Sequence, residues 1–464
     1  AELKKNKISA KVSDLQTYKF AEIQKEELVL FIVSTQGDGE FPASSLGFYE
    51  ALNAASVDLS HLQYGILGLG DSSYPLFCNA ALLLDEALVS KNAKCFTTLI
   101  KADVDFTNEV QELISATLKY VTERTVPSTL QPLTLKPAST HEKKIFKGVV
   151  AKNILLNDIG SQKVTHHIEI DVDDHHIYQP GDALGIYPTN NTLEINKIIN
   201  LLSIEPEKSI QIKEEEKSAF EWLQILNIRG LSKKTLDSIG TLTGIKNEFV
   251  KSDLYPFLLQ SSGQINVEDL FEVLGKIPPR LYSIASSPNA HDGKIHLTVG
   301  LNTFQVLGQT HYGLASKHLI ELSEGSDISF YIHKNNSFRL PSEEKDVIMI
   351  GPGTGIAPFR SFIAERDALG HSGKNWLFFG EQTFAYDFYY QTEIQEWLST
   401  GALTKFNGAF SRDQKQKIYV QNRIQEHAHE FFQWLENGAI IYICGQKDPM
   451  SKDVENTILD IISQ

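Results

Sequence analysis

The chain has 464 residues, of which 42% are hydrophobic and 22% charged, and its formal net charge is −15. This length suits roughly two to four domains with full cores, and the composition is that of an ordinary globular protein. The negative charge argues against nucleic acid as the main partner, because phosphate contacts need clustered cations.

Targeting and membrane segments are not recognisable in the sequence. No apolar run approaches the roughly 18 residues that a membrane helix needs, and the opening residues AELKKNKISA lack the apolar core of a signal peptide. Cys78, Cys95 and Cys444 are too few and too scattered for a disulfide framework or a zinc site. We therefore expect a cytoplasmic protein with no membrane partner and no metal site.

Residues 1–122 alternate apolar strands with amphipathic helices. The runs ELVLFIVST and YGILGL lead into glycine-containing loops and then helices, which is the pattern of a parallel sheet covered on both faces. From Glu26 to Ser90 there are nine carboxylates and no Lys or Arg. Two interpretations stay open: an ordinary acidic surface, or a docking face for a basic partner, whose encounter rate complementary charge would raise.

The rest of the chain divides into three further segments. Residues 123–143 are rich in Pro, Ser and Thr and predict an extended linker. Residues 144–345 contain strand-rich runs typical of a barrel, interrupted at about 191–277 by a helix-rich insertion. Residues 346–464 return to strand–loop–helix units with the buried runs NWLFFG, KFNGAF and AIIYICG, which predict another parallel sheet.

A glycine-rich loop opens this last segment. In MIGPGTGIAPFRSF, Gly351, Gly353 and Gly355 stand between a buried strand and a helix. Glycines there let the backbone approach a pyrophosphate, which the helix N-terminus then favours. Taken alone, the loop fits a nucleotide site and a purely structural turn about equally well.

A cluster of cations and hydroxyls favours NADP over NAD. In SRDQKQKIYVQ, Ser411 and Arg412 follow a strand, with Lys417, Tyr419 and Gln421 close behind. A ribose 2′-phosphate needs cations and hydroxyl donors, whereas a bare 2′-hydroxyl calls for Asp or Glu.

The stretch RLYSIASSP is typical of a flavin site. Arg280 could pair with a flavin pyrophosphate, Tyr282 could lie against a planar ring, and Ser283 could reach the ring's N5 region. Further on, LTVG supplies main-chain donors, and YGLASKHL opens a helix suited to phosphate. This order of motifs ahead of the nucleotide loop makes an incidental match improbable.

Together these motifs resemble the diflavin reductase family, in which a flavodoxin-like FMN domain is fused to a ferredoxin–NADP reductase-like unit. Within it, STQGDGEFP, GLGDSSYPLFC, YQPGDALGIYP, RLYSIASS, GPGTGIAPFRSF, KIYVQ and CGQKDPMSKDVE most resemble the flavoprotein subunits of bacterial NADPH-dependent sulfite reductases. The resemblance covers essentially the whole chain. It implies a multidomain α/β plus β-barrel fold: a flavodoxin-like domain, an FAD-binding barrel with a helical insertion, and a Rossmann-like NADP domain.

The resemblance also implies a set of cofactor contacts. For FMN they are Ser34, Thr35, Gln36, Gly37, Leu69, Gly70, Asp71, Tyr74, Phe77 and Cys78, with Tyr74 stacked on the flavin ring. For FAD they are Arg280, Leu281, Tyr282, Ser283, Thr298, Val299, Gly300, Phe304, Gly313, Leu314, Ala315 and Ser316. For NADP they are Gly353, Thr354, Ser411, Arg412, Lys417, Ile418, Tyr419, Val420, Gln421 and Asp453.

Two residues receive catalytic roles from the resemblance. Ser283 and Cys444 are expected to align the nicotinamide for hydride transfer to FAD, from which electrons pass singly to FMN and on to an acceptor. On its own, a lone cysteine such as Cys444 is usually an inert core residue. His166 and His167 are expected to pack along a strand edge rather than to bind a metal.

Three departures from the family pattern stand out. Phe304 occupies a position where the sulfite reductase pattern usually has Tyr, so adenine stacking is expected to survive without the hydroxyl. The first strand and the FMN phosphate loop precede Ala1 in the family pattern, and an acidic residue and a terminal aromatic follow Gln464. We therefore expect a fragment clipped at both ends, with strong FAD retention and weak FMN binding.

The acceptor is the least specified part of this interpretation. The first choice is the sirohaem and iron–sulfur hemoprotein subunit of sulfite reductase, docked on the acidic face of the FMN domain. The alternatives are a haem monooxygenase or another redox partner, and, from a different class, a flavin-free scaffold subunit. The sequence leaves the oligomeric state open, a homo-oligomer included.

Overall fold

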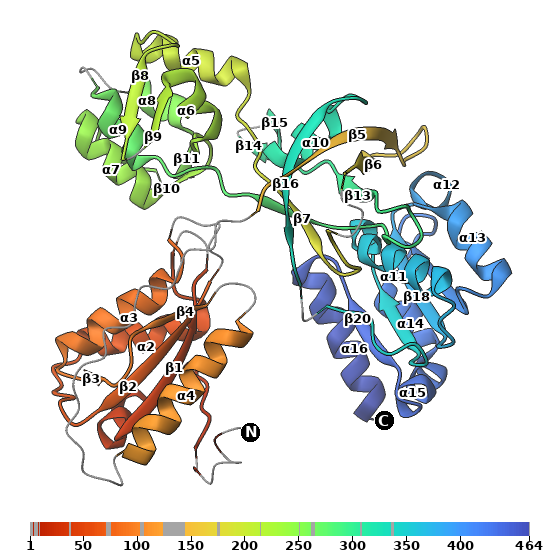
Figure 1. Ribbon diagram of the computed structural model, residues 1–464, viewed down its shortest axis with the longest axis horizontal. Helices are drawn as coiled ribbons and strands as arrows, with labels where there is room; N and C mark the ends of the chain where they lie inside the picture. The colour runs from red at the N-terminus through yellow and green to blue at the C-terminus, as the bar shows by residue number, and fades with distance from the viewer. Residues whose placement is uncertain are drawn as a thin grey trace. The chain divides into compact units, whose positions relative to one another are not determined.

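The computed structural model describes two compact units (Figure 1), formed by residues 1–141, 196–222 and 226–278, and by residues 142–195, 223–225 and 279–464. The described residues are 3, 8, 10–36, 39–70, 76–102, 106–123, 144–173, 177–213, 215–249, 251–260, 265–306, 309–335 and 338–463. Residues 124–143 of the predicted linker lie outside them.

A parallel sheet opens the first unit, as its alternating apolar runs predict. Its strands are β1 (Leu28–Ser34), β2 (Gln63–Leu69), β3 (Lys94–Cys95) and β4 (Ile100–Ala102), and β2 pairs with the other three. The helical segments beside it are η1 (Phe20–Lys25), α2 (Ala43–Ala54), α3 (Asn79–Ser90) and α4 (Thr107–Glu123).

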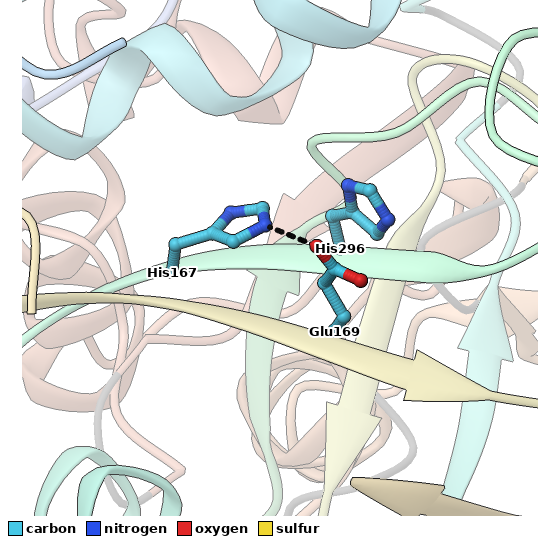
Figure 2. Close-up of side chains that lie close together, drawn as sticks. All are labelled: His167, Glu169 and His296. Atoms are coloured by element: carbon cyan, nitrogen blue, oxygen red, sulfur yellow. Dashed lines mark hydrogen bonds and ion pairs between the residues drawn. The ribbon is translucent and has the colours of Figure 1, made fainter. Parts of the chain in front are cut away.

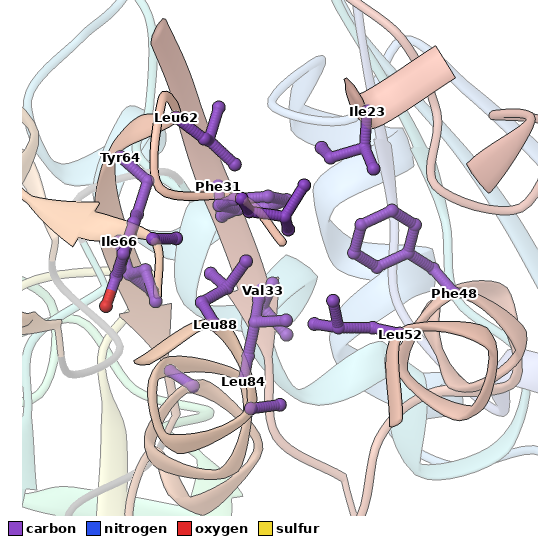
Figure 3. Packing of buried hydrophobic residues seen from close by; sticks show 14 of the residues in the cluster. Ile23, Phe31, Val33, Phe48, Leu52, Leu62, Tyr64, Ile66, Leu84 and Leu88 are labelled. Atoms are coloured by element: carbon purple, nitrogen blue, oxygen red, sulfur yellow. The ribbon is translucent and has the colours of Figure 1, made fainter. Parts of the chain in front are cut away.

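Successive residues of a strand point to opposite faces of the sheet, and both faces here are packed. Phe31, Val33 and Tyr64 pack against side chains of α2 and α3, as Figure 3 shows. On the other face, Leu67 packs with Leu113 of α4. The expected parallel sheet with two covered faces is confirmed.

A helix-rich region lies between Thr192 and Val273, and most of its residues are in the same unit. Its helices are α5 (Thr192–Leu202), α6 (Ala219–Ile225), α7 (Lys233–Thr243), α8 (Leu254–Leu258) and α9 (Val267–Val273). Two short hairpins accompany them, β8 (Ser209–Ile212) with β9 (Glu215–Ser218), and β10 (Leu231–Ser232) with β11 (Lys251–Ser252). Trp222 is buried in this region, and its indole N–H donates to the carbonyl of Ile210 at 2.9 Å.

An antiparallel barrel opens the second unit. Its strand order is β12-β7-β16-β5-β6-β13, and a bridge between Ile284 and Leu297 joins the two ends of that order. The strands are β5 (Phe146–Leu155), β6 (Thr165–Asp171), β7 (Ala183–Ile186), β12 (Arg280–Ser283), β13 (Ile295–Gly300) and β16 (Asp327–His333). Because β6 pairs with β5 and β13, the expectation that His166 and His167 lie on a strand edge is wrong.

The last part of the chain forms the second parallel sheet, ordered β19-β18-β17-β20. Its strands are β17 (Val347–Ile350), β18 (Asn375–Glu381), β19 (Lys405–Phe410) and β20 (Ile440–Ile443). Around it are α11 (Ala357–Ala368), α12 (Phe384–Asp387), α13 (Gln391–Thr400), α14 (Val420–Glu426), α15 (Ala428–Glu436) and α16 (Lys452–Ser463).

Alternation along these strands fills two separate cores. Met349 and Phe379 pack with residues of α11 and α13, whereas Ile348 and Phe378 pack with residues of α14, α15 and α16. Figure 1 shows these helices flanking the strands. Within the described part of the chain, no helix combines the length and apolarity needed to span a bilayer.

Candidate functional site

Two loops predicted to contact FMN meet at the end of the first sheet. The Thr35 N–H donates to the Leu69 carbonyl at 2.8 Å, and Thr35 Oγ1 accepts from the Ala80 N–H at 3.2 Å. The Asn79 side chain donates to the Gly39 carbonyl at 2.8 Å, which ties the first loop to the start of α3. The structure thus brings together loops that lie more than thirty residues apart in the sequence, a separation of 45 residues for the Thr35–Ala80 bond.

Cys78, which follows the second loop, has a strained backbone conformation. Cys78 is fully buried with a φ of 56°, and its thiol donates to the Gly68 carbonyl at 3.1 Å. Gly70 packs closely on the Cys78 amide and the Phe77 ring, so any side chain there would crowd them. This tight turn suits a loop that approaches a planar ring. Gly37, Asp71 and Tyr74 lie outside the described residues.

The predicted FAD strand Arg280–Ser283 is β12, which pairs with β7 on the barrel. Leu281 is 41% exposed, whereas Tyr282 packs against the barrel core, so the strand has one apolar side chain accessible to a ligand. Burial raises the pKa of Tyr282 to about 12, so its phenol stays neutral and able to donate a hydrogen bond. The strand therefore fits a flavin ring lying against it.

The other predicted FAD residues lie at the end of β13 and at the start of a helix. Leu314, Ala315 and Ser316 begin α10 (Leu314–Glu321), with Gly313 as the cap residue. The Ser316 hydroxyl already donates to the Gly313 carbonyl at 3.0 Å and accepts from the Asn302 N–H at 3.1 Å. The helix N-terminus therefore offers main-chain N–H groups to a phosphate, which fits an FAD pyrophosphate.

Thr298 and Phe304 differ in what their side chains can do. Thr298 Oγ1 is 2.7 Å from the Tyr390 hydroxyl, so this side chain is already engaged within the protein. Val299 and Gly300 follow it at the end of β13, where they pair with β6. Phe304, on the hairpin β14 (Thr303–Val306) with β15 (Gln309–Tyr312), is 46% exposed. An exposed aromatic ring of this kind is suited to stacking on an adenine.

The predicted nucleotide residues gather at one edge of the second parallel sheet. The carboxyl ends of β17, β18, β19 and β20 meet there, the usual place for a ligand in such sheets. Gly353 has a φ of 61°, which favours glycine, and begins η2 (Gly353–Ile356) just before α11. Thr354 lies in the same turn.

Backbone bonds hold the predicted 2′-phosphate segment beside that turn. The Ser411 N–H donates to the Glu381 carbonyl at 2.9 Å, and the Arg412 N–H to the Gln382 carbonyl at 2.7 Å. Arg412, Lys417 and Tyr419 are exposed, as ligand-facing side chains should be.

The remaining NADP candidates lie around the start of α14. Ile418 packs on the core beneath it, and Val420 is buried in that core. The Gln421 amide donates to Asp453 at 3.3 Å, while its buried oxygen has no hydrogen-bond partner within the described structure. An unpartnered buried acceptor at this edge fits a ligand that donates to it.

Glu381 and Lys163 were not predicted, and they lie at the same edge. The Lys163 ammonium is 2.5 Å from Glu381 Oε1, which also accepts from the Tyr389 hydroxyl at 3.1 Å. A Cβ on Gly353 would be 3.4 Å from that oxygen, so the pair is adjacent to the glycine turn.

Glu381 ends the strand that follows the glycine loop, where NAD-specific folds place a carboxylate for the ribose 2′-hydroxyl. Its side chain is only 2% exposed and its carboxylate is already engaged. The pair therefore adds the positive charge of Lys163 at this edge, while the Glu381 carboxylate is not available to accept a hydrogen bond from the 2′-hydroxyl of NAD. No motif reveals it, because 218 residues separate the two side chains.

The two predicted catalytic residues meet in the structure. Burial raises the pKa of the Cys444 thiol, and a hydrogen bond with Ser283 partly offsets this shift, so the thiol remains protonated at neutral pH. The Cys444 N–H donates to the Ile350 carbonyl at 3.0 Å, which fixes the residue at the end of β20 beside the glycine loop. A hydroxyl from the barrel and a thiol from the nucleotide sheet thus converge on one point.

A buried cluster of histidines lies between the barrel and the second parallel sheet. Figure 2 shows His167, Glu169 and His296, each of which offers one ring nitrogen or carboxylate oxygen within 4.8 Å of those of the other two. His167 Nε2 is 3.3 Å from Glu169 Oε1, and Arg360 Nη1 is 3.0 Å from His296 Nδ1.

This cluster has the residue types of a metal site, but its hydrogen bonding disfavours one. An arginine can only donate, so His296 Nδ1 must accept and the proton of the neutral ring is on Nε2. That nitrogen then has no lone pair for a metal. The guanidinium of Arg360 and the Lys152 ammonium, 3.1 Å from Glu169, add two positive charges beside it.

The cluster predicts a loss of stability in mild acid. Burial, followed by the charge of Arg360, lowers the pKa of His167 to about 4, and the same causes lower the pKa values of His291 and His296. Between pH 6.5 and 4 the unfolded chain binds a proton at His167 that the folded chain does not. The free energy of unfolding therefore decreases as the pH is lowered through this window. For His167 alone the loss reaches about 3 kcal/mol at the acid end.

Unfolding midpoints measured from pH 7.5 to 4.5 should therefore fall less steeply in His167→Gln than in the parent chain. His61→Gln is the matched control, because His61 is exposed. If the unfolding midpoints of His167→Gln and the parent chain fell equally steeply as the pH was lowered, His167 would not be a cause of the loss of stability in acid.

Comparison with known protein families assigns the three parts of the chain in order. Residues 1–116 match the family described as Flavodoxin, residues 138–243 and 246–318 match the FAD binding domain, and residues 349–456 match the Oxidoreductase NAD-binding domain. The predicted fold class, a flavodoxin-like part followed by FAD- and NAD-binding parts, is confirmed.

Comparison with individual proteins gives matches along the whole chain. The Sulfite reductase [NADPH] flavoprotein alpha-component of Bacillus subtilis (strain 168) is 35% identical, covering 100% of this chain and 81% of that protein. Its counterpart in Buchnera aphidicola subsp. Acyrthosiphon pisum is 36% identical over 99% of this chain and 81% of its own length. The counterpart in Vibrio vulnificus (strain CMCP6) is 35% identical, covering 100% of this chain and 79% of that protein.

Proposed function

The chain belongs to the family of NADPH-dependent sulfite reductase flavoprotein alpha-components, and from this we propose which cofactor each of its segments binds. Residues 1–122 bind FMN, residues 144–345 bind FAD through the barrel, and residues 346–464 bind NADPH, with 123–143 as linker. The protein passes electrons from NADPH through FAD and FMN to an acceptor. The bound flavins supply the redox chemistry, and the chain supplies binding and orientation.

The observation that carries this proposal is the meeting of Ser283 and Cys444. The barrel strand holding Ser283 presents the flavin, and the sheet end holding Cys444 presents the nicotinamide. Their hydroxyl and thiol are both neutral, so they line the reaction point without placing a charge on it. Orientation of this kind can contribute several kcal/mol to a transfer step by holding the reactants in a near-attack geometry.

NADPH is the preferred nucleotide because the ribose edge carries cations. Ser411, Arg412 and Lys417 offer a hydroxyl and two positive charges for a 2′-phosphate. Glu381, whose place at the end of β18 could instead serve a bare ribose, is occupied by Lys163 and Tyr389.

The proposed acceptor is the hemoprotein subunit of sulfite reductase, docked on the acidic surface of residues 26–90. Glu40, Glu50, Asp58 and Glu86 in this segment are exposed, and no Lys or Arg lies between residues 26 and 90. Such a surface favours a basic partner and speeds its encounter at low salt.

The test is to mix the purified protein with the hemoprotein component and follow sulfide formed from sulfite and NADPH. With FMN and FAD added, sulfide should form, and Glu40→Gln combined with Glu86→Gln should slow its formation at low salt. Glu205→Gln, an exposed carboxylate outside the segment, serves as control. Rapid NADPH-dependent reduction of cytochrome c without any sulfide would point to another haem partner. A preparation with no bound flavin would point to a scaffold.

A further inference from the structure

One helix, α11, lies close to both residues of the proposed hydride-transfer site, Ser283 and Cys444. Helix α11 bonds to the three residues that come shortly after Ser283 in the chain. Arg360 Nη1 donates to the Ala285 carbonyl (2.8 Å), Ser361 Oγ to the Ser286 carbonyl (2.5 Å), and Ser287 Oγ to Glu365 Oε2 (2.5 Å). All of these residues are buried. Beside its hydrogen bonds within the barrel, the backbone leading away from Ser283 is therefore also held by side chains of α11.

The turn that precedes the N-terminal end of the same helix packs against Cys444. The glycine turn η2 runs directly into α11, and Gly355 in that turn packs so closely on Cys444 that a Cβ would overlap its carbonyl oxygen. A shift of α11 would therefore move the glycine turn against Cys444 and, at the same time, pull on the segment that follows Ser283.

Among the α11 side chains that contact the barrel segment, Arg360 also binds a second helix. Its Nε and Nη2 donate to the two oxygens of Glu393 on α13 at 2.7 and 2.8 Å, and Nη1 contacts both the Ala285 carbonyl and His296. The guanidinium also lies 4.8 Å from the ring centroid of Tyr390. Only the planar fork of an arginine can make these contacts together, since a lysine offers one ammonium.

We propose that Arg360 is a positioning residue for hydride transfer, which through α11 sets the relative placement of Ser283 and Cys444. It touches neither the predicted flavin strand nor the predicted nucleotide contacts directly. Its effect is to hold the barrel strand and the glycine turn at one fixed separation. This inference rests on the proposed roles of Ser283 and Cys444.

Arg360→Lys tests the inference, with Arg366→Lys as the matched control. Arg366 lies on the same helix and is also buried, and its guanidinium donates to the carbonyls of Lys345 and Gly373, outside the barrel. The first readout is the rate of flavin bleaching after rapid mixing with NADPH, per bound FAD. We expect it to fall by about 10- to 100-fold in Arg360→Lys, with KM for NADPH little changed.

The second readout needs no cofactor. Alkylation of Cys444 in the flavin-free protein should accelerate about threefold or more in Arg360→Lys, relative to the exposed Cys95 as internal reference. Arg366→Lys should leave both readouts at parent values. Parent-like bleaching and alkylation in Arg360→Lys, or equal changes in both variants, would overturn the inference. Absence of bleaching in the parent protein would instead overturn the proposed function.

Discussion

Arg412→Ala is expected to lower kcat/KM for NADPH by about 10- to 100-fold while leaving kcat/KM for NADH nearly unchanged. A charge-assisted hydrogen bond contributes about 1.5–3 kcal/mol, and each 1.4 kcal/mol corresponds to tenfold. Arg412 follows the carboxyl end of β19 and is fixed there by its N–H bond to Gln382. Only the nucleotide with a 2′-phosphate should lose this contact.

The control for this change is Lys405→Ala at the opposite end of the same strand. Lys405 pairs with Glu430 and lies over the Trp376 ring, away from the nucleotide edge. Steady-state kinetics with both nucleotides would measure the effect. An unchanged preference for NADPH in Arg412→Ala would show that the 2′-phosphate is bound elsewhere.

Gly355→Ala is expected to lower the rate of flavin reduction by NADPH by about 100-fold or more, while FAD stays bound. A methyl group at this position cannot coexist with the Cys444 carbonyl, so either the glycine turn or the end of β20 must move. Displacement of reacting groups by about 1 Å is enough for a loss of this size. The predicted FAD residues of β12 and of the α10 N-terminus lie on elements other than this turn.

Gly47→Ala is the matched control, because no atom lies within 4 Å of the added methyl group. Gly47 is inside α2, where alanine is the better helix former, so this variant should be slightly more stable and equally active. Rapid-mixing absorbance and flavin content measure both variants. Parent-like reduction by Gly355→Ala would mean that the turn is not close-packed on Cys444.

The sequence predicts the local parts of the site well, because each part is a contiguous strand, turn and helix. The glycine turn with its φ of 61° at Gly353, the helix beginning at Leu314, and the strand Arg280–Ser283 all occur where the motifs indicate. Short-range patterns of apolar residues and glycines determine such units without reference to the rest of the fold.

The parts that the sequence does not reveal depend on strand order and on distant partners. His167 was expected at a strand edge, yet β6 is flanked on both sides because strand pairing in the barrel is non-local. Lys163 and Glu381 are 218 residues apart in the sequence, and Arg360 and His296, which are in contact, are 64 residues apart. Such pairings follow from how the barrel packs on the second sheet, which no single segment encodes.

The most direct test of the account is anaerobic titration of the purified protein with NADPH and, separately, with NADH, followed by flavin absorbance. Bound FAD should bleach rapidly with NADPH and much more slowly with NADH. Protein that contains no FAD, or whose FAD is not reduced by NADPH, would contradict it.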